Sequence, residues 1–446
     1  MAKLQAGYGE KVITPPMGVE LSGYGFYLKR KAESVLDDLK ARALYLDDGG
    51  RRIMLISCDL VGLTVSVSDG IRGAVSKAAG IPTANIMLAC THTHTGPATM
   101  PLPGIGEMDT GYVKSLPDAI VAAASSAVAD AAPAEFSYSF EALEPLGYNR
   151  RDGSFEGIDP YLKIAYFEHG SAGGDILLLS YACHAVILGR ATRVSADWPG
   201  AAVRAVEATG RRAIFFQGFC GDIDPVTQLN RWGEGTADDL ALYGRIVSDR
   251  AAKSRRYAAE PVASGHSGAE AGAGGGAGGG ALLRITERRV RIPLSVPPKK
   301  KIGRMAALFL EKNSGFPMAE RFAEEWKKTA LESHEALAAR PYVEGVPIQA
   351  VGIGGLEIIG LPGEAFSLFG SSLKESYPTL VPVGYANGDI GYFPTRGAFE
   401  DPGDYACYCA PMFYTVFPFT PDIEDILLRA SRDVLDDLKE QSPAPS

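Results

Sequence analysis

Residues 86–97 read IMLACTHTHTGP, a continuous apolar run followed at once by two histidines, His92 and His94. Residues 85–90 are predicted to form a buried strand. If the strand continued through the THTH sequence, residues i and i+2 would share a face and both imidazoles would enter the same space. The pair therefore predicts the start of a metal site or of an acid/base site.

Around this stretch, short β-like runs alternate with helical segments from residue 8 to about residue 260. Strands are predicted at 41–46, 52–58, 161–167, 176–182 and 213–217, and helices at 69–79, 113–131 and 200–209. The alternation predicts an α/β fold of mixed β-sheets flanked by helices.

The later part of the chain continues the pattern. Residues 282–294 are predicted as one or two strands, 317–340 as a charged amphipathic helix, and 356–360 as a strand. The sequence Thr420-Pro421-Asp422 is typical of an N-cap with proline at the first helical position, which predicts a last helix through about Lys439. Residues 265–281 are rich in glycine and predict a flexible insertion within a single catalytic domain over residues 1–440.

Composition narrows the class of protein. The 446 residues carry a formal net charge of −9, so a phosphate-neutralising surface and a nucleic-acid partner are not expected. No run approaches the ~18 apolar residues of a membrane span, and the first residues lack the apolar segment of a secretory signal, which predicts a cytoplasmic protein without integral membrane association. Six scattered cysteines fit neither a thiolate zinc site nor a disulfide framework. A homo-oligomer is left open.

Polar clusters follow four of the strong β runs. They are CTHTHTGP at 90–97, Cys183-His184, QGFCGDIDP at 217–225 and Pro362-Gly363-Glu364. Functional groups gather at strand ends in sheet proteins, so these clusters are expected to converge. Two or three imidazoles with a carboxylate are the ligand chemistry of a catalytic zinc that keeps one position open.

Two other kinds of histidine metal site fit less well. An HxHxDH site is excluded because Thr95 and Gly96 follow His94. A barrel amidohydrolase needs further histidines at later strand ends, but His266 lies in the glycine-rich segment and His334 in the charged helix.

Several motifs in one order resemble the neutral/alkaline (non-lysosomal) ceramidase family. They are AGYGEKVITPP at 6–16, GYG at 23–25, ARAL at 41–44, THTHTGP at 91–97, Asn149-Arg150, SADWPG at 195–200 and PGE at 362–364. The resemblance runs from residue 6 to about residue 405 and implies a neutral-ceramidase-like catalytic domain.

The resemblance implies a zinc hydrolase that cleaves an N-acyl amide, with one Zn²⁺ per chain. Its ligands fall on His92, His184, Glu364 and Tyr392, the last in Gly391-Tyr392-Phe393-Pro394-Thr395. It also implies that His94 contacts the substrate or transition state and that Arg150 and Tyr405 face the scissile carbonyl.

The chain also departs from the family pattern. Asp224 occupies the position of a family serine in Gly221-Asp222-Ile223-Asp224-Pro225, so a serine-dependent step is not expected. The sequence has no room for the family's C-terminal immunoglobulin-like domain, and it lacks the family's export signal. Both differences favour a small soluble substrate over ceramide.

Four aspartates have two interpretations each. Asp59, Asp222 and Asp224 are either turn residues that bond their own backbone or carboxylates that orient the site, and Asp197 is either such a carboxylate or a cap of a helix starting near Pro199. His169, His266 and His334 are interpreted as solvent-facing.

The sequence therefore predicts a zinc-dependent amidohydrolase in which activated water attacks a linear carbon–nitrogen bond. The alternatives are a zinc esterase or lactonase with the same site, a true ceramidase, and a non-catalytic protein whose metal is structural or absent.

Overall fold

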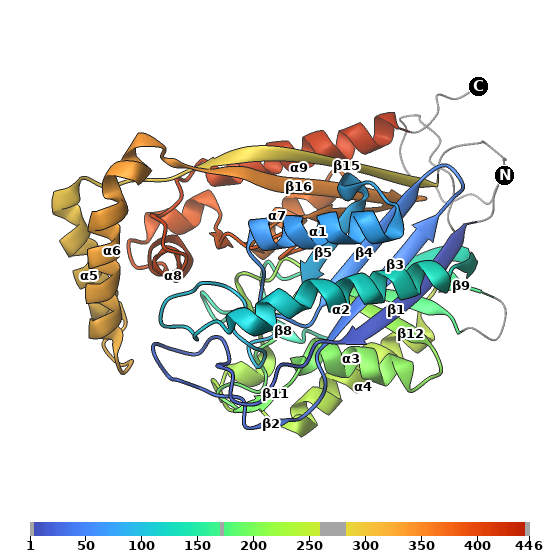
Figure 1. The fold of residues 1–446 in the computed structure, drawn as a ribbon, viewed down its shortest axis with the longest axis horizontal. Helices are drawn as coiled ribbons and strands as arrows, with labels where there is room; N and C mark the ends of the chain where they lie inside the picture. Colours follow the sequence, from blue (N-terminus) through green and yellow to red (C-terminus); the bar gives the residue numbers. More distant parts are fainter. Residues whose placement is uncertain (1–3, 170–173, 259–281, 442–446) are drawn as a thin grey trace.

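The computed structural model describes residues 4–169, 174–258 and 282–441. Within these ranges the chain forms two five-stranded sheets and one four-stranded sheet, with helices packed on their outer faces (Figure 1). The predicted α/β class with mixed sheets is confirmed. The glycine-rich segment 265–281 lies outside the described residues, and the single domain over 1–440 stays a prediction.

The first sheet has the order β5-β4-β3-β1-β6. Its strands are β1 (Gln5–Val12), β3 (Lys40–Asp47), β4 (Arg52–Cys58), β5 (Ile86–Cys90) and β6 (Ala132–Pro133). β4 and β5 are parallel and the other pairs are antiparallel. Helices α1 (Val65–Ala79) and α2 (Thr110–Ala129) cover it. Glycine on β1 allows α2 to lie directly on the sheet, because a Cβ at Gly7 would come within 2.1 Å of the Ala127 carbonyl oxygen.

The second sheet has the order β12-β10-β9-β7-β14. Its strands are β7 (Glu135–Ala142), β9 (Tyr161–Glu168), β10 (Ile176–Tyr181), β12 (Arg212–Gln217) and β14 (Tyr257–Ala258). β10 and β12 are parallel. Helix α3 (Asp197–Glu207) packs between β12 and α4 (Ala237–Lys253).

The third sheet has the order β15-β16-β17-β19. Its strands are β15 (Leu283–Pro293), β16 (Tyr342–Ile353), β17 (Leu356–Gly360) and β19 (Leu380–Val383). β17 and β19 are parallel, and α9 (Ile423–Glu440) packs on β15 and β16. Between β15 and β16 the chain makes a hairpin of α5 (Lys299–Lys312) and α6 (Ala319–Ala339), which lies at one end of the molecule in Figure 1.

Short elements connect the sheets and surround the site. They are β2 (Ser34–Val35), β8 (Gly147–Asn149), β11 (Arg193–Val194), β13 (Ile223–Pro225), β18 (Glu364–Ala365), β20 (Tyr392–Phe393), α7 (Ser367–Lys374), α8 (Ala410–Phe413), three 3₁₀ turns (Thr83–Asn85, Val226–Gln228 and Arg396–Glu400) and a π-helical turn (Tyr405–Cys409). A π-helical turn is uncommon and is often found at functional sites.

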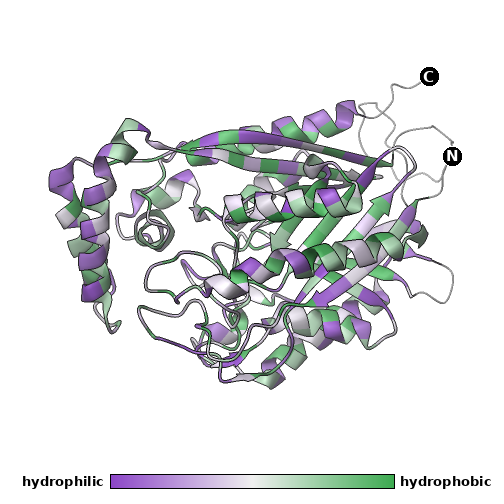
Figure 2. Cartoon of the chain, viewed as in Figure 1, coloured by the Kyte–Doolittle hydropathy of each residue, from purple (hydrophilic) through white to green (hydrophobic). Residues whose placement is uncertain are grey.

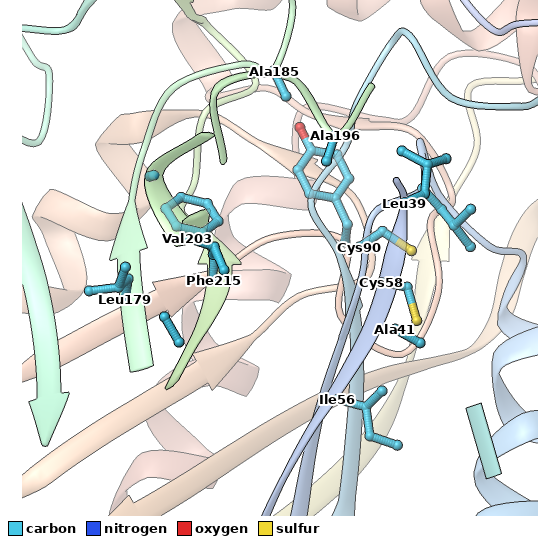
Figure 3. Close-up of a cluster of buried hydrophobic side chains, with 14 of the residues drawn as sticks. Leu39, Ala41, Ile56, Cys58, Cys90, Leu179, Ala185, Ala196, Val203 and Phe215 are labelled. Carbon is cyan, nitrogen blue, oxygen red and sulfur yellow. The ribbon is translucent and has the colours of Figure 1, made fainter. Parts of the chain in front are cut away.

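Apolar side chains between the sheets form the core. Figure 3 shows one cluster, in which Ile56 and Cys58 of β4 share the interior with Phe215 of β12 and Val203 of α3. Figure 2 shows the same separation of apolar and polar residues: the strands are mainly hydrophobic, and the outer faces of the helices are hydrophilic. Within the described residues, no helix combines the length and apolar character needed to cross a bilayer.

The predicted elements lie within about four residues of the observed ones, and the largest difference is at α1, which was predicted from residue 69 and begins at Val65. The N-termini of two other helices also differ in detail from the prediction. The last helix begins at Ile423, so Pro421 precedes it, and Asp422 at its N-cap makes no side-chain capping bond. Helix α3 begins at Asp197 rather than near Pro199. Residues 282–294 form one strand, β15, with an irregularity between Val290 and Ile292.

Candidate metal centre and active site

Each of the three large sheets contains one parallel strand pair, and these three pairs end near the same place. His92 follows β5, His184 follows β10 and Glu364 follows β17, each strand being one member of a parallel pair. The carboxyl ends of parallel strands are where open sheets bind ligands. A cavity of about 610 Å³ opens there, and His92, His94, Arg150, Asp224, Glu364, Tyr392 and Tyr405 are among its lining residues.

The two histidines of the THTH sequence meet, although not on a strand. β5 ends at Cys90, and His92 has a left-handed backbone with φ +62°. The loop is held by hydrogen bonds from the His92 amide to the Leu60 carbonyl and from the His94 amide to the Ala185 carbonyl. The two Nε2 atoms lie 3.1 Å apart. The shared space was predicted correctly, but the strand geometry used to predict it is wrong.

His92 and His184 are oriented by backbone carbonyls behind them. His92 Nδ1 lies 2.6 Å from the Val61 oxygen, and His184 Nδ1 lies 2.6 Å from the Cys220 oxygen. A carbonyl only accepts hydrogen bonds, so the proton of each neutral imidazole is placed on Nδ1 and the lone pair on Nε2. Both lone pairs point toward the centre of the site, as in metal-binding histidines whose other nitrogen is hydrogen-bonded.

The Glu364 carboxylate faces the same two nitrogens. Its Oε2 lies 3.2 Å from His184 Nε2 and 3.4 Å from His92 Nε2, and all three side chains are buried. The backbone places it there because β18 pairs with β20, so Glu364 lies opposite Tyr392. Two lone pairs and an anion facing one another call for a cation, so this donor set fits a zinc ion.

His94 is within reach of the same centre. The ligand atoms of His92, His94 and His184 all lie within 4.8 Å of one another. The edge of the Tyr24 ring contacts His94 at a centroid distance of 5.6 Å, and a Cβ on Gly23 would come 2.4 Å from His94 Nδ1. Burial and the neighbouring His92 and His184 hold the pKa of His94 well below its usual value, so its imidazole is neutral at pH 7.

Arg150 also lines the cavity. Pairing of β8 with β13 brings it beside Asp224, whose Oδ1 is 3.3 Å from the guanidinium. The guanidinium also donates to the Tyr392 hydroxyl at 2.8 Å and lies 5.9 Å from the centre of the Tyr405 ring. Burial raises the pKa of Tyr392 well above its usual value, the Glu364 charge adds to this, and Arg150 opposes it. Arginine and two phenols thus form one polar surface next to Glu364.

The other predicted aspartates support the loops. Asp197 accepts hydrogen bonds from the amides of Ile187 and Leu188, and therefore anchors the loop after His184. Asp222 accepts from the amide and hydroxyl of Ser367 and joins α7 to the loop after β12.

Asp59, at the end of β4, forms an ion pair with Arg42 and accepts a hydrogen bond from the Lys40 amide. His169 and His334 each hydrogen-bond a distant backbone carbonyl, Ala6 and Pro297, and do not line the cavity.

Three further residues near the site were not singled out in the sequence: the buried Tyr385 and Asp389, and the partly buried Tyr414. The Tyr414 hydroxyl lies 3.1 Å from Glu364 Oε1 and 3.2 Å from Asp389 Oδ2, and the Tyr385 ring stacks on His92 at 4.0 Å. Burial, with the charge of Glu364, raises the pKa of Asp389 to about 7. The polar run Asn387-Gly388-Asp389 after β19 follows the same strand-end rule and was a usable signal for Asp389.

The fold and site together define an α/β protein that collects imidazoles and a carboxylate at the ends of parallel strands. The model of the neutral/alkaline non-lysosomal ceramidase N-terminal family matches residues 4–213. The resemblance predicted from the motifs is thus confirmed over residues 4–213, a little less than half of the chain.

Comparison with known proteins also finds ceramidases. The neutral ceramidase of Mycobacterium tuberculosis (strain ATCC 25618 / H37Rv) is 25% identical over 84% of this chain and 68% of its own length. A crystal structure of neutral ceramidase from Pseudomonas aeruginosa has a TM-score of 0.71 at 20% identity, covering 100% of this chain and 76% of that chain. A ceramidase complexed with C2 gives a TM-score of 0.71 at 19% identity, covering 100% and 77%. At these identities the structural likeness establishes the fold.

Proposed function

We propose that this protein is a zinc-dependent amidohydrolase that cleaves a linear carbon–nitrogen bond of a small soluble substrate. His92, His184, Glu364 and Tyr392 would hold a single ion, and we call the first three the ligand group. The observation that carries the proposal is the convergence of two carbonyl-oriented Nε2 atoms on one buried carboxylate.

When bound, a zinc ion in such a site supplies Lewis acidity toward the amide carbonyl and lowers the pKa of water to ~7. The choice of Glu364 and Tyr392 over His94 as ligands follows what the motif resemblance to neutral ceramidases implies. It leaves His94, which lines the cavity, free to face the substrate.

Arg150 and Tyr405 would stabilise the carbonyl oxygen as negative charge develops on it. Both line the cavity, and a donor placed in this way is worth about 3 kcal/mol in comparable enzymes. Asp224 holds one guanidinium nitrogen and Tyr392 the other, which fixes the plane of Arg150. No step is assigned to a serine, because Asp224 occupies that position.

His94 is proposed to carry the proton to the leaving nitrogen. Its imidazole lies beside the ligand group and lines the cavity, where it can accept a proton from water and release it to the amine. A donor is required because an amide nitrogen leaves poorly without a proton.

The cavity volume supports a small substrate. About 610 Å³ lies within the ~300–1,000 Å³ of ordinary small-molecule sites. We expect kcat/KM for a compact amide to exceed that for a long-chain ceramide.

The test is hydrolysis of matched amides and esters by purified protein, before chelation, after it, and after zinc is returned. The proposal expects amide turnover that chelation abolishes and zinc restores. Ester turnover without amide turnover would assign the site to an esterase, and the absence of chelator-sensitive hydrolysis on both would leave the metal a structural role. A higher kcat/KM for long-chain ceramide would make the protein a true ceramidase.

A further inference from the structure

A continuous series of aromatic rings runs around the cavity from His94 to Tyr392. We call it the aromatic collar, and its members in order are Tyr24, Trp232, Phe316, Phe26, Phe413 and Tyr405. Successive ring centroids are 6.1, 6.3, 5.9, 5.6 and 6.3 Å apart, and every member lines the cavity. Tyr24 contacts His94 at one end, and Tyr405 contacts Tyr392 at 5.7 Å at the other.

The collar is assembled from segments that are distant in the sequence. Trp232 lies in the loop before α4, Phe316 in the turn between α5 and α6, and Phe413 in α8, which Figure 1 draws beside the α5–α6 hairpin. Because every member lines the cavity and the two ends contact His94 and Tyr392, the collar borders the space next to the proposed catalytic and ligand residues.

One half of the collar is fixed and the other is open. Phe26 and Phe413 are buried, and Phe26 also stacks on Phe322 of α6 at 5.0 Å. In contrast, Trp232 is 48% exposed and Tyr405 is 46% exposed. The Arg190 guanidinium lies 5.3 Å from the centre of the Trp232 ring, which helps to hold the indole in place. Large aromatic surfaces held open at a cavity mark a site that a ligand covers.

We propose that the collar binds an aryl or similarly compact ring-bearing group attached to the scissile amide, with Trp232 and Phe316 as specificity-determining residues. The inference rests on the proposed function for the identity of the reacting bond. Its physical basis is that rings at centroid spacings of 5.6–6.3 Å offer faces and edges to a further ring, whereas a linear alkyl chain gains from burial alone.

The binding test does not require turnover. The chain contains three tryptophans, of which Trp198 and Trp326 are buried, so ligand-induced changes in exposed tryptophan fluorescence report on Trp232. Two non-hydrolysable ketone isosteres of the amide serve as probes, one with a 3-phenylpropyl group and one with a linear chain of equal octanol–water partition coefficient. We expect the phenyl ketone to quench the fluorescence and to bind about tenfold more tightly than the alkyl ketone.

Variants then separate recognition from stability. Trp232→Ala is expected to remove about tenfold of the phenyl-over-alkyl preference in kcat/KM, Trp232→Phe to restore it within about twofold, and Phe316→Leu to reduce it at nearly constant volume. Leu242, 43% exposed on α4 and outside the cavity lining, provides the matched control Leu242→Ala, which should leave the preference unchanged.

The outcomes are distinct for the two proposals. Equal binding of the two ketones, or an equal loss for both substrates in Trp232→Ala, would overturn the role of the collar. Preferential phenyl binding without any amide hydrolysis would leave the collar's binding role standing and refute the proposed reaction.

Discussion

His92 and His94 are separated by one residue, yet the structure holds them in different ways. His92, like His184, is fixed from behind by a short hydrogen bond to a carbonyl, and it faces a buried carboxylate. His94 is bounded by Gly23 and the edge of Tyr24, and it lines the cavity at the start of the aromatic collar. The donor geometry of the ligand group fits the proposed ion, whereas His94 lies on the cavity lining, where the proposal expects the substrate.

Removing a member of the ligand group tests this comparison with the largest expected effect. In His92→Ala or Glu364→Gln, bound zinc should fall far below one per chain and amide turnover below detection. Each change removes one of the donor atoms that a catalytic zinc ion needs. Metal analysis of the purified proteins measures this. His169→Ala, which changes a histidine outside the cavity, should keep both zinc and activity. Full zinc in either ligand variant would remove that residue from the ligand group.

His94→Ala should separate metal binding from catalysis. We expect stoichiometric zinc and a kcat about 10²- to 10⁴-fold lower, the usual contribution of a proton-transfer group. Loss of zinc in this variant would instead place His94 in the coordination sphere, as the close grouping of the three imidazoles also allows.

Tyr414→Phe tests how the ligand group is supported. The change removes the hydroxyl that bridges Glu364 and Asp389, and loss of such a partner typically lowers metal affinity by about 10- to 100-fold. A competition titration with a zinc chelator measures the change. Tyr408→Phe is the control, because that hydroxyl bonds the Phe399 carbonyl and lies outside the cavity lining.

Gly23→Ala is expected to have the smallest effect and to act on His94 alone. Gly23 and Gly18 share a positive φ, +92° and +88°, so alanine costs similar backbone strain at either position. A Cβ at Gly23 would meet His94 Nδ1, whereas at Gly18 nothing lies within 4 Å. We expect kcat about tenfold lower in Gly23→Ala, with zinc retained, and near-normal kcat in Gly18→Ala. Equal kcat values in the two variants would show that the orientation of His94 does not matter.

The sequence predicted the elements that follow from local pattern. Strands 52–58 and 213–217 were found from apolar runs, and the strand-end rule brought His92, His184 and Glu364 together in prediction as in structure. Sequence-based prediction failed where the backbone departs from regular elements. His92 and Asp197 both have a left-handed φ, which the spacing of apolar residues does not reveal.

Contacts between distant segments were beyond reach of the sequence. Tyr414, at the end of α8, meets Glu364 fifty residues and Asp389 twenty-five residues earlier in the chain, and Phe26 meets Phe413 across nearly the whole chain. Aromatic residues at these positions are ordinary core residues when seen in sequence. The support of Glu364 and the collar therefore required the tertiary structure.

Anomalous diffraction at the zinc edge from crystals of the zinc-loaded protein tests the central claim most directly. The account predicts one strong peak within about 2.0–2.2 Å of His92 Nε2, His184 Nε2 and a Glu364 carboxylate oxygen, with His94 outside the coordination sphere. A peak bonded to all three imidazoles and not to Glu364, or no peak in the cavity, would contradict it.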